Sequence, residues 1–304
     1  MPHDHGHAHL DPKSGDRRVA IAIWANGLLT VAQILGGIVS GSLALIADAI
    51  HNFSDMASLL IAFGARKIAR RPADARMTYG YGRVEIVAAL INYTTLVVIG
   101  AWLLYEGAMR LVDPPQVAGW TVIVMGGVAL IVDTLTAALT YSMQKDSTNI
   151  RALFLHNLSD ALASVAVVAG GTLILLYDWR WVDPAVTIGI AAYILYLALT
   201  EIGGPIRTLM LGTPPGLDVE RLLERLEAAE GVSGLHHLHV WQMQEHEAAL
   251  EAHVVVSDAD WPRAEEIKDR LRALCRDEFG IGHTTFELER PGAGCPDAQR
   301  VGHG

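Results

Sequence analysis

Six long apolar segments fill the first two thirds of this chain. Each is close to the roughly 20 residues that an α-helix needs to cross the hydrocarbon core of a bilayer. Turn-forming pairs and triplets separate them, such as Gly41-Ser42 and Asp113-Pro114-Pro115. The predicted helices are Val19–Ser40, Leu43–Ile68, Val84–Leu111, Trp120–Met143, Ile150–Tyr177 and Pro184–Gly203. We therefore expect an α-helical membrane protein with six transmembrane helices.

The composition agrees with this division. The chain has 304 residues, of which 51% are hydrophobic and only 18% are charged, which is too apolar for an ordinary soluble domain. Residues 205–304 carry ten Lys and Arg against eighteen Asp and Glu, whereas the preceding part is nearly neutral. A soluble acidic region thus follows the membrane part, and its charge excludes nucleic acid as a partner.

The basic residues predict the orientation in the membrane, because cytoplasmic loops carry an excess of Lys and Arg. They cluster at the N-terminus and after the second, fourth and sixth helices, at Lys13, Arg17, Arg18, Arg66, Lys67, Arg70, Arg71, Arg76, Arg83, Lys145, Arg151 and Arg207. The alternate loops offer only Arg110 and Arg180. Both termini are therefore expected in the cytoplasm. Cys275 and Cys295 form no disulfide framework, which suits two free thiols in a reducing compartment.

The acidic region has readable periodicity. Helical spacing marks Val219–Ala229 and Trp261–Phe279, and strands are predicted at His236–Met243, Ala249–Val256 and His283–Leu288. This αββαβ order predicts an open α+β sandwich with both helices on one face of the sheet. The predicted organisation is a His-rich N-terminal tail at 1–18, a six-helix transport domain at 19–204, the αββαβ domain at 205–290 and a C-terminal tail at 291–304.

One pentapeptide occurs twice inside the apolar segments, as His51-Asn52-Phe53-Ser54-Asp55 and His156-Asn157-Leu158-Ser159-Asp160. A charged residue at membrane depth costs about 2.5–3.5 kcal/mol on insertion scales and is a functional candidate by default. In each copy the His and Asp are four residues apart and share one helix face. Together the two faces supply two imidazoles and two carboxylates, a four-ligand set that favours zinc.

The alternative for polar residues in a helical bundle is interhelical hydrogen bonding. We assign that role to Asn26, Asn92 and Asp133, which lie on the first, third and fourth predicted helices. Asp48 precedes His51 and Asp55 on the same stripe of the second helix. Metal binding by the repeated His and Asp would release protons, because ligands must be deprotonated, and this couples metal to proton movement.

At these residues the chain resembles the cation diffusion facilitator family, in particular its bacterial zinc, cadmium and cobalt efflux members. The likeness rests on both HxxxD motifs and on the stretches Ser42-Leu43-Ala44-Leu45-Ile46-Ala47-Asp48 and Tyr79-Gly80-Tyr81-Gly82-Arg83-Val84-Glu85. It implies a metallochaperone-like αββαβ domain and a homodimer in the bacterial inner membrane. It further implies export of cytoplasmic Zn²⁺, and also of Cd²⁺ or Co²⁺, in exchange for H⁺. The transport site would be His51, Asp55, His156 and Asp160, between the second and fifth helices.

The resemblance also implies a regulatory Zn²⁺ site in the cytoplasmic domain. Its ligands would be His236, His253 and Glu289, with His239, Glu287 and His283 as neighbouring alternatives on the predicted strands. Some family members bind metal in the loop after the second helix, but here that loop keeps Asp74 and has no His. We therefore expect that loop site to be absent or weakened. The N-terminal His3, His5, His7 and His9 form a tract that could collect metal loosely.

Two other function classes, a metalloenzyme and a metal sensor, are alternatives to a transporter. An intramembrane metalloenzyme needs an open metal position and a general base, and the sequence has no HExxH motif to supply them. A metal sensor would explain the cytoplasmic ligands but not a metal site at membrane depth. We therefore expect a transporter and not an enzyme.

Overall fold

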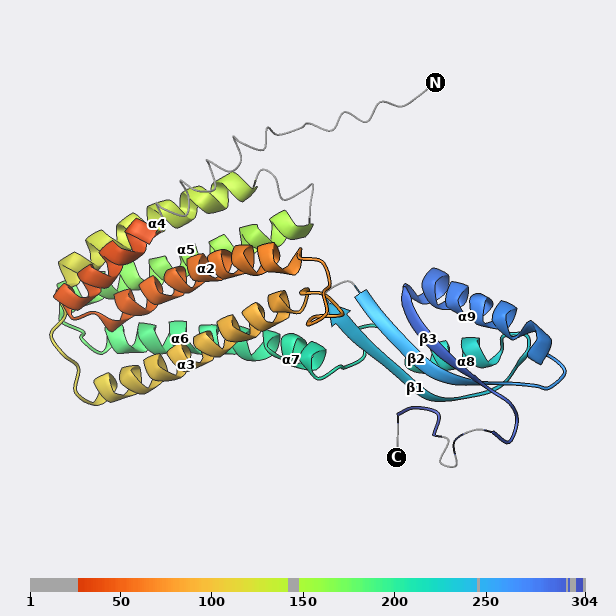
Figure 1. Cartoon of the computed structure of the whole chain (residues 1–304). Helices are drawn as coiled ribbons and strands as arrows, with labels where there is room; N and C mark the ends of the chain where they lie inside the picture. The colour runs from red at the N-terminus through yellow and green to blue at the C-terminus, as the bar shows by residue number, and fades with distance from the viewer. Residues whose placement is uncertain (1–26, 142–147, 245–246, 294, 296–298, 303–304) are drawn as a thin grey trace, which may run out of the picture. The chain divides into compact units, whose positions relative to one another are not determined.

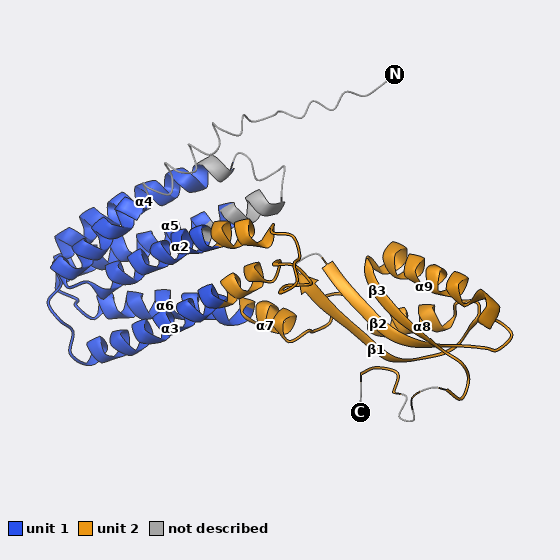
Figure 2. Cartoon of the chain, viewed as in Figure 1, with its two compact units in different colours: residues 1–61, 91–200 blue, residues 62–90, 201–304 orange. Residues whose placement is uncertain are grey.

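The computed structural model describes residues 27–141, 148–244, 247–293, 295 and 299–302, with the side chains at 59, 139–140, 148–153 and 156 left out. The chain divides into two compact units (Figure 2). The first comprises residues up to 61 together with 91–200, and the second comprises 62–90 together with 201–304. The predicted start of the first helix at Val19, Asn26 and the N-terminal His tract lie outside the described residues.

The first unit is helical (Figure 1). A helix at Gly27–Ser40 precedes α2 (Leu43–Ala69), α3 (Val84–Val112), α4 (Gly119–Tyr141), α5 (Thr148–Tyr177) and α6 (Val182–Glu201). Every predicted apolar segment therefore contains a helix. Its core consists of small and branched side chains at Leu43, Ala44, Leu45, Ala47, Leu103, Val122, Val167, Ile190, Ala191 and Ile194.

Only four described helices are long and apolar enough to cross a membrane. They are Val84–Val112, Gly119–Ala138, Asn157–Tyr177 and Val182–Leu209. The described part of the first helix, Gly27–Ser40, is too short to count. Helix α2 is long enough, but its ionisable side chains at Asp48, His51, Asp55, Arg66 and Lys67 lower its hydropathy. Six spans are thus not confirmed, and α2, which falls short, carries the first copy of the repeated motif.

A tight turn joins the first helix to α2, as Gly41-Ser42 predicts. Gly41 has φ +74°, and a Cβ there would lie 2.8 Å from the Gln116 carbonyl oxygen, so only glycine fits without strain. The following turn of α2 is capped by Asp183 at the start of α6. Its carboxylate accepts hydrogen bonds from the Ser42 hydroxyl and from the backbone N–H groups of Leu43 (2.8 Å) and Ala44 (3.4 Å). This cap ties two helices of the bundle at one end.

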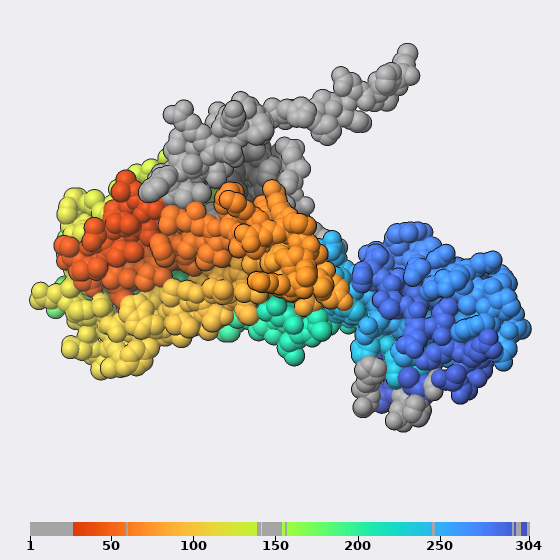
Figure 3. Space-filling view, in the orientation of Figure 1, coloured from red at the N-terminus to blue at the C-terminus, as the bar shows by residue number. Residues whose placement is uncertain are grey.

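Helices α2 and α3 lie side by side (Figure 3). The Ser58 hydroxyl on α2 lies 2.6 Å from Asn92 Oδ1 on α3. On the other side of the unit, the Ser164 hydroxyl of α5 donates to Asp133 Oδ2 of α4 at 2.8 Å. The predicted interhelical hydrogen bonds of Asn92 and Asp133 are therefore confirmed.

The second unit contains a three-stranded sheet with helices packed against it. A short helix that the sequence pattern did not predict, α7 (Gly203–Leu209), leads into α8 (Val219–Glu227), β1 (Val232–Gln244), β2 (Glu247–Val256), a 3-10 turn (Trp261–Arg263), α9 (Ala264–Phe279) and β3 (His283–Glu289). Strand β2 lies between β1, to which it is antiparallel, and β3, to which it is parallel. The predicted αββαβ order is confirmed.

The helices of this unit cover one face of the sheet (Figure 1). Leu222, Leu223 and Leu226 of α8 and Ile267 and Leu271 of α9 are fully buried there, as their helical spacing predicts. They pack against strand residues including Leu250, Val254 and Phe286. The other face of the sheet is therefore left for polar side chains.

The C-terminal residues differ from the separate tail that the sequence suggests. Residues 299–302 run beside β1, where the N–H groups of His237 and Leu238 donate to the carbonyl oxygens of Gln299 (2.8 Å) and Arg300 (3.1 Å). The Gly302 N–H donates back to the Leu238 carbonyl at 3.2 Å. The end of the chain thus extends the sheet at its β1 edge.

Candidate metal centres

The first copy of the repeated motif lies on α2 and meets the second copy on α5. His51 Nε2 is 3.2 Å from Asp160 Oδ1 and 3.8 Å from Asp55 Oδ2. One ligand atom from each of these three residues lies within 4.8 Å of the other two. The i, i+4 spacing brings His51 and Asp55 together on one helix, and packing of α5 against α2 adds Asp160. The arrangement presents one imidazole and two carboxylates to a common point.

This cluster is buried within the first unit. His51 and Asp160 are 6% and 8% exposed, so neither is solvated as a surface ion would be. A cavity of about 390 Å³ reaches His51 and is lined mainly by α5 and α6, at Ser159, Leu162, Ala163, Ala166, Val186, Gly189, Ile190 and Tyr193. Its walls are largely apolar. Among the described residues that line the cavity, His51 carries a usual metal-ligand group, and Asp55 and Asp160 lie beside it.

The fourth predicted ligand, His156, lies on α5 one turn before Asp160, but its side chain is outside the described residues. Asp48 lies one turn before His51 on α2, where its carboxylate accepts a hydrogen bond from Gln33 Nε2 at 2.7 Å. Asp48 is 1% exposed. It therefore belongs to the buried polar layer next to the cluster rather than to the cluster itself.

A second group of potential ligands lies on the sheet of the second unit. His236 on β1 and His253 on β2 are paired in the register of the two strands. Glu289 at the end of β3 contacts both: its Oε1 accepts from His253 Nδ1 at 2.7 Å, and its Oε2 lies 3.2 Å from His236 Nε2. The structure therefore brings together the three residues His236, His253 and Glu289 that the sequence singled out.

The structure also shows which of the alternative ligands on these strands lie near His253. Glu287 is exposed but reaches His253 Nε2 at 3.4 Å. His239 is paired in register with Glu251 and lies outside the ligand cluster among the described residues. His283 is exposed, and its ring instead meets that of Tyr79 edge-on at 6.0 Å. His236 is thus the one of the two alternative His on β1 that faces His253.

Two members of this cluster were missed by the sequence analysis. His237 and Cys295 each offer a ligand atom within 4.8 Å of His236 and His253. Cys295 Sγ lies 3.7 Å from His253 Nδ1. The sequence interpretation treated Cys295 only as a free thiol, because a lone Cys has no motif spacing. The His236-His237 pair was the available signal, but strand alternation would send the two rings to opposite faces.

Asp74, in the loop between α2 and α3, is occupied by local hydrogen bonds. Its carboxylate accepts from the backbone N–H groups of Arg76 (2.7 Å) and Met77 (2.9 Å) and from the Tyr81 hydroxyl (2.7 Å). These bonds, led by that of Tyr81, lower the pKa of Asp74. The carboxylate therefore shapes the loop between α2 and α3.

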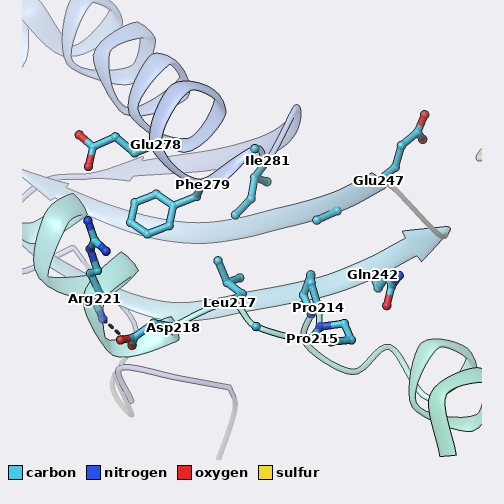
Figure 4. Close-up of a pocket in the computed structure, with 13 residues that line it drawn as sticks. Pro214, Pro215, Leu217, Asp218, Arg221, Gln242, Glu247, Glu278, Phe279 and Ile281 are labelled. Atoms are coloured by element: carbon cyan, nitrogen blue, oxygen red, sulfur yellow. Dashed lines mark hydrogen bonds between the residues drawn. The ribbon is translucent and has the colours of Figure 1, made fainter. Parts of the chain in front are cut away.

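Another pocket of the second unit, about 460 Å³ in volume, shares no residue with either cluster (Figure 4). Asp218 at its edge caps α8 by accepting from the Arg221 N–H at 3.0 Å. Glu278 pairs with Arg225, and this hydrogen bond lowers the pKa of Glu278. The described residues that line the pocket include no His or Cys. It therefore offers no metal-ligand set of the zinc type.

Comparison with known proteins decides the family. Residues 19–210 match the cation efflux transmembrane domain, and residues 214–291 match the cytoplasmic domain of cation efflux proteins. The chain belongs to the cation efflux family. It is therefore an integral membrane protein that exports metal cations, and the enzyme alternative is excluded.

Curated relatives match over nearly the whole chain. The metal cation efflux system protein CzcD of Cupriavidus metallidurans is 34% identical over 98% of this chain and 93% of its own length. A cadmium, cobalt and zinc/H(+)-K(+) antiporter of Bacillus subtilis is 33% identical over 93% of this chain and 92% of its own. The zinc transporter ZitB of Escherichia coli is 31% identical over 98% of this chain and 95% of its own length. Among solved structures, the metal-bound C-terminal domain of CzcD is 32% identical, covering 24% of this chain and 99% of that chain with a TM-score of 0.23.

Proposed function

We propose that this cation efflux protein exports Zn²⁺, with Cd²⁺ and Co²⁺ as competing substrates, through the cluster of His51, Asp55 and Asp160. The observation that carries the proposal is the convergence of these side chains within 4.8 Å inside the helical unit. His156 precedes Asp160 by one helical turn and is proposed as the fourth ligand. Two imidazoles and two carboxylates suit Zn²⁺, while the lack of a thiolate disfavours copper(I).

Proton exchange supplies the driving force in this proposal. Carboxylates and imidazoles bind metal only when deprotonated, so protonation of the empty site and metal loading exclude each other. When the site is exposed alternately to the two sides of the membrane, metal is released on one side and protons on the other. Transporters whose site stays near the bilayer midplane work in this way. The antiporter relative in Bacillus subtilis has a name that agrees with this mode.

The sequence supports an orientation in the membrane, and the second cluster supports a regulatory site. The excess of Lys and Arg in alternate loops supports cytoplasmic termini in a bacterial inner membrane. The second unit then lies in the cytoplasm, where His236, His253 and Glu289 would mark a regulatory zinc site. We propose that the protein works as a homodimer and that cytoplasmic zinc draws its soluble domains together.

The test is zinc uptake into inside-out proteoliposomes with an acidic interior. Wild-type protein should take up ⁶⁵Zn²⁺ when the pH gradient is present and stop when an ionophore collapses it. The Asp55→Ala/Asp160→Ala variant should show no uptake above empty vesicles, because two of the proposed ligands are gone. The matched control is Asp113→Ala, which removes an exposed carboxylate between α3 and α4 and should keep full uptake.

Two results would overturn the proposal. Retained uptake in the double variant, with equal reconstitution, would show that the site lies elsewhere. Uptake that does not depend on the pH gradient would rule out exchange with protons but would not affect the site assignment.

A further inference from the structure

Residues 299–302 are held at the β1 edge of the sheet. Beyond the backbone pairing with β1, Arg300 forms ion pairs with Glu220 (3.1 Å) and Glu227 (2.9 Å) of α8. Leu238 and Val301 form a parallel bridge. With the chain held at both β3 and β1, Cys295 lies between these anchors.

The three imidazoles of the cluster are arranged almost symmetrically. The ring centroids of His236, His237 and His253 are 5.1, 5.2 and 5.1 Å apart. The centre of such a triangle is about 3 Å from each centroid, which suits rings whose nitrogens bind a zinc ion at about 2.0–2.1 Å. The thiol of Cys295 approaches the same group from the C-terminal segment.

The backbone of β1 is distorted to bring His237 into this group. His237 has φ +50°, which is uncommon for a residue other than glycine, and the pairing of β1 with β2 shifts register between His236 and His239. Without this irregularity, adjacent residues of a strand would point to opposite faces. Strained backbone of this kind persists where the surrounding structure requires it, and it is concentrated at functional sites.

The cluster also holds buried polar atoms that have no hydrogen-bond partner among the residues that the structure describes. His236 Nε2 and Glu289 Oε2 are inaccessible to solvent and face each other at 3.2 Å, but not in hydrogen-bonding geometry. His236 and Glu289 are 6% and 9% exposed. Such atoms cost free energy unless something else satisfies them, and a cation bound at His236 Nε2 would satisfy that nitrogen.

We propose that Cys295 is a ligand of the cytoplasmic metal site, with its thiolate joining the imidazoles of His236, His237 and His253. This deepens the regulatory site of the proposed function by adding sulfur to it. Glu289, in contact with two of the imidazoles, then orients them, as carboxylates commonly do for ligating His. A three-nitrogen, one-sulfur site selects zinc-class ions such as Zn²⁺, Cd²⁺ and Co²⁺ over Mg²⁺ or Mn²⁺. The bound ion also fastens the C-terminal segment to the sheet.

The experiment uses Co²⁺ as the probe on the full-length protein in detergent. A Co²⁺–thiolate bond produces intense charge-transfer absorption in the near ultraviolet, whereas nitrogen and oxygen ligands do not. The proposed transport site contains no sulfur and cannot produce this band. Wild-type protein should show it, and Cys295→Ser should lose it. The matched control is Cys275→Ala, which removes the other thiol and should keep the band.

A second measurement follows the thiol itself. Zn²⁺ should slow alkylation of Cys295 by iodoacetamide, as read by mass spectrometry, and His237→Ala should weaken that protection. A charge-transfer band that persists in Cys295→Ser, or alkylation of Cys295 that Zn²⁺ does not slow, would overturn the proposal. Neither result bears on the transport site, since the uptake assay with Asp55→Ala/Asp160→Ala tests that site separately.

Discussion

The two cysteines of this chain show how far the surroundings of a residue determine its chemistry. Cys275 is fully buried among Leu226, Leu271 and the other apolar side chains of the soluble core. This burial raises the pKa of its thiol to about 12, because the apolar core disfavours the thiolate. Cys295 lies instead among imidazoles that could bind a metal together with it. One thiol thus packs as a small apolar group, while the other is available for coordination.

The raised pKa of Cys275 makes the stability of the soluble core sensitive to alkali. The pKa of the Cys275 thiol is about 9 in the unfolded chain and about 12 in the folded protein. Unfolding therefore releases a proton between these pH values. The contribution is complete below about pH 9 and is lost as the pH rises toward 12. In thermal unfolding of the full-length protein, Cys275→Ala should therefore lose less stability than wild type between about pH 8 and about pH 10. Equal losses in both proteins would contradict this account.

At the scale of elements, α2 is the helix whose placement matters most, since it carries His51 and Asp55. Its N-terminal end is held by Asp183 of α6 and by the Gly41 turn, whose carbonyl accepts a hydrogen bond from Arg110 Nη1 of α3 at 2.9 Å. A carboxylate at a helix N-terminus satisfies free N–H groups and also interacts favourably with the helix dipole. Three helices are therefore fixed together about two to three helical turns before His51.

Removal of this cap should destabilise the helical unit. Asp183→Ala leaves the N–H groups of Leu43 and Ala44 without their acceptor, and hydrogen bonds to a charged group contribute about 1.5–3 kcal/mol each. We expect a lower unfolding temperature in detergent and weaker metal binding at the transport site. Asp183→Asn, which keeps one acceptor oxygen, should lie between the alanine variant and wild type. An unchanged unfolding temperature in Asp183→Ala would show that the cap does not stabilise the bundle.

At the scale of the whole molecule, the proposed transport site in one unit and the proposed regulatory site in the other would allow the exported ion to control its own export. Metal that binds one state of the soluble domain more tightly favours that state in proportion to the difference in affinity. We expect cytoplasmic Zn²⁺ to accelerate transport beyond simple filling of the transport site. His253→Ala/Glu289→Ala should lose this acceleration, whereas His283→Ala, which alters an exposed His outside the cluster, should keep it.

The measurement is the initial rate of gradient-driven uptake in proteoliposomes as a function of zinc on the cytoplasmic side. Wild type and His283→Ala should give a sigmoidal dependence, and the double variant a hyperbolic one. If all three curves have the same shape, the soluble domain does not regulate the rate.

The sequence by itself determined the helical segments, the αββαβ order and the residues of the repeated motif. Each of these depends on local patterns: apolar length, periods of 3.6 and 2 residues, and i, i+4 spacing on one helix. Even the pairing of His51 with Asp160 could be anticipated, because the motif occurs twice. The ionisable residues of the motif also lower the hydropathy of α2, which is one of the two predicted spans that fall outside the four long apolar helices.

Only the tertiary structure decided which distant residues meet. In the folded chain Cys295 lies beside His253, and Asp183 caps the N-terminal end of α2. His236, and not His239, lies in the ligand cluster among the described residues. These contacts depend on a register shift in β1, on the course of the C-terminal segment and on how α6 packs, none of which has a local sequence signal. An irregular strand and a long-range cap are products of packing, so they appear only when the whole chain is folded.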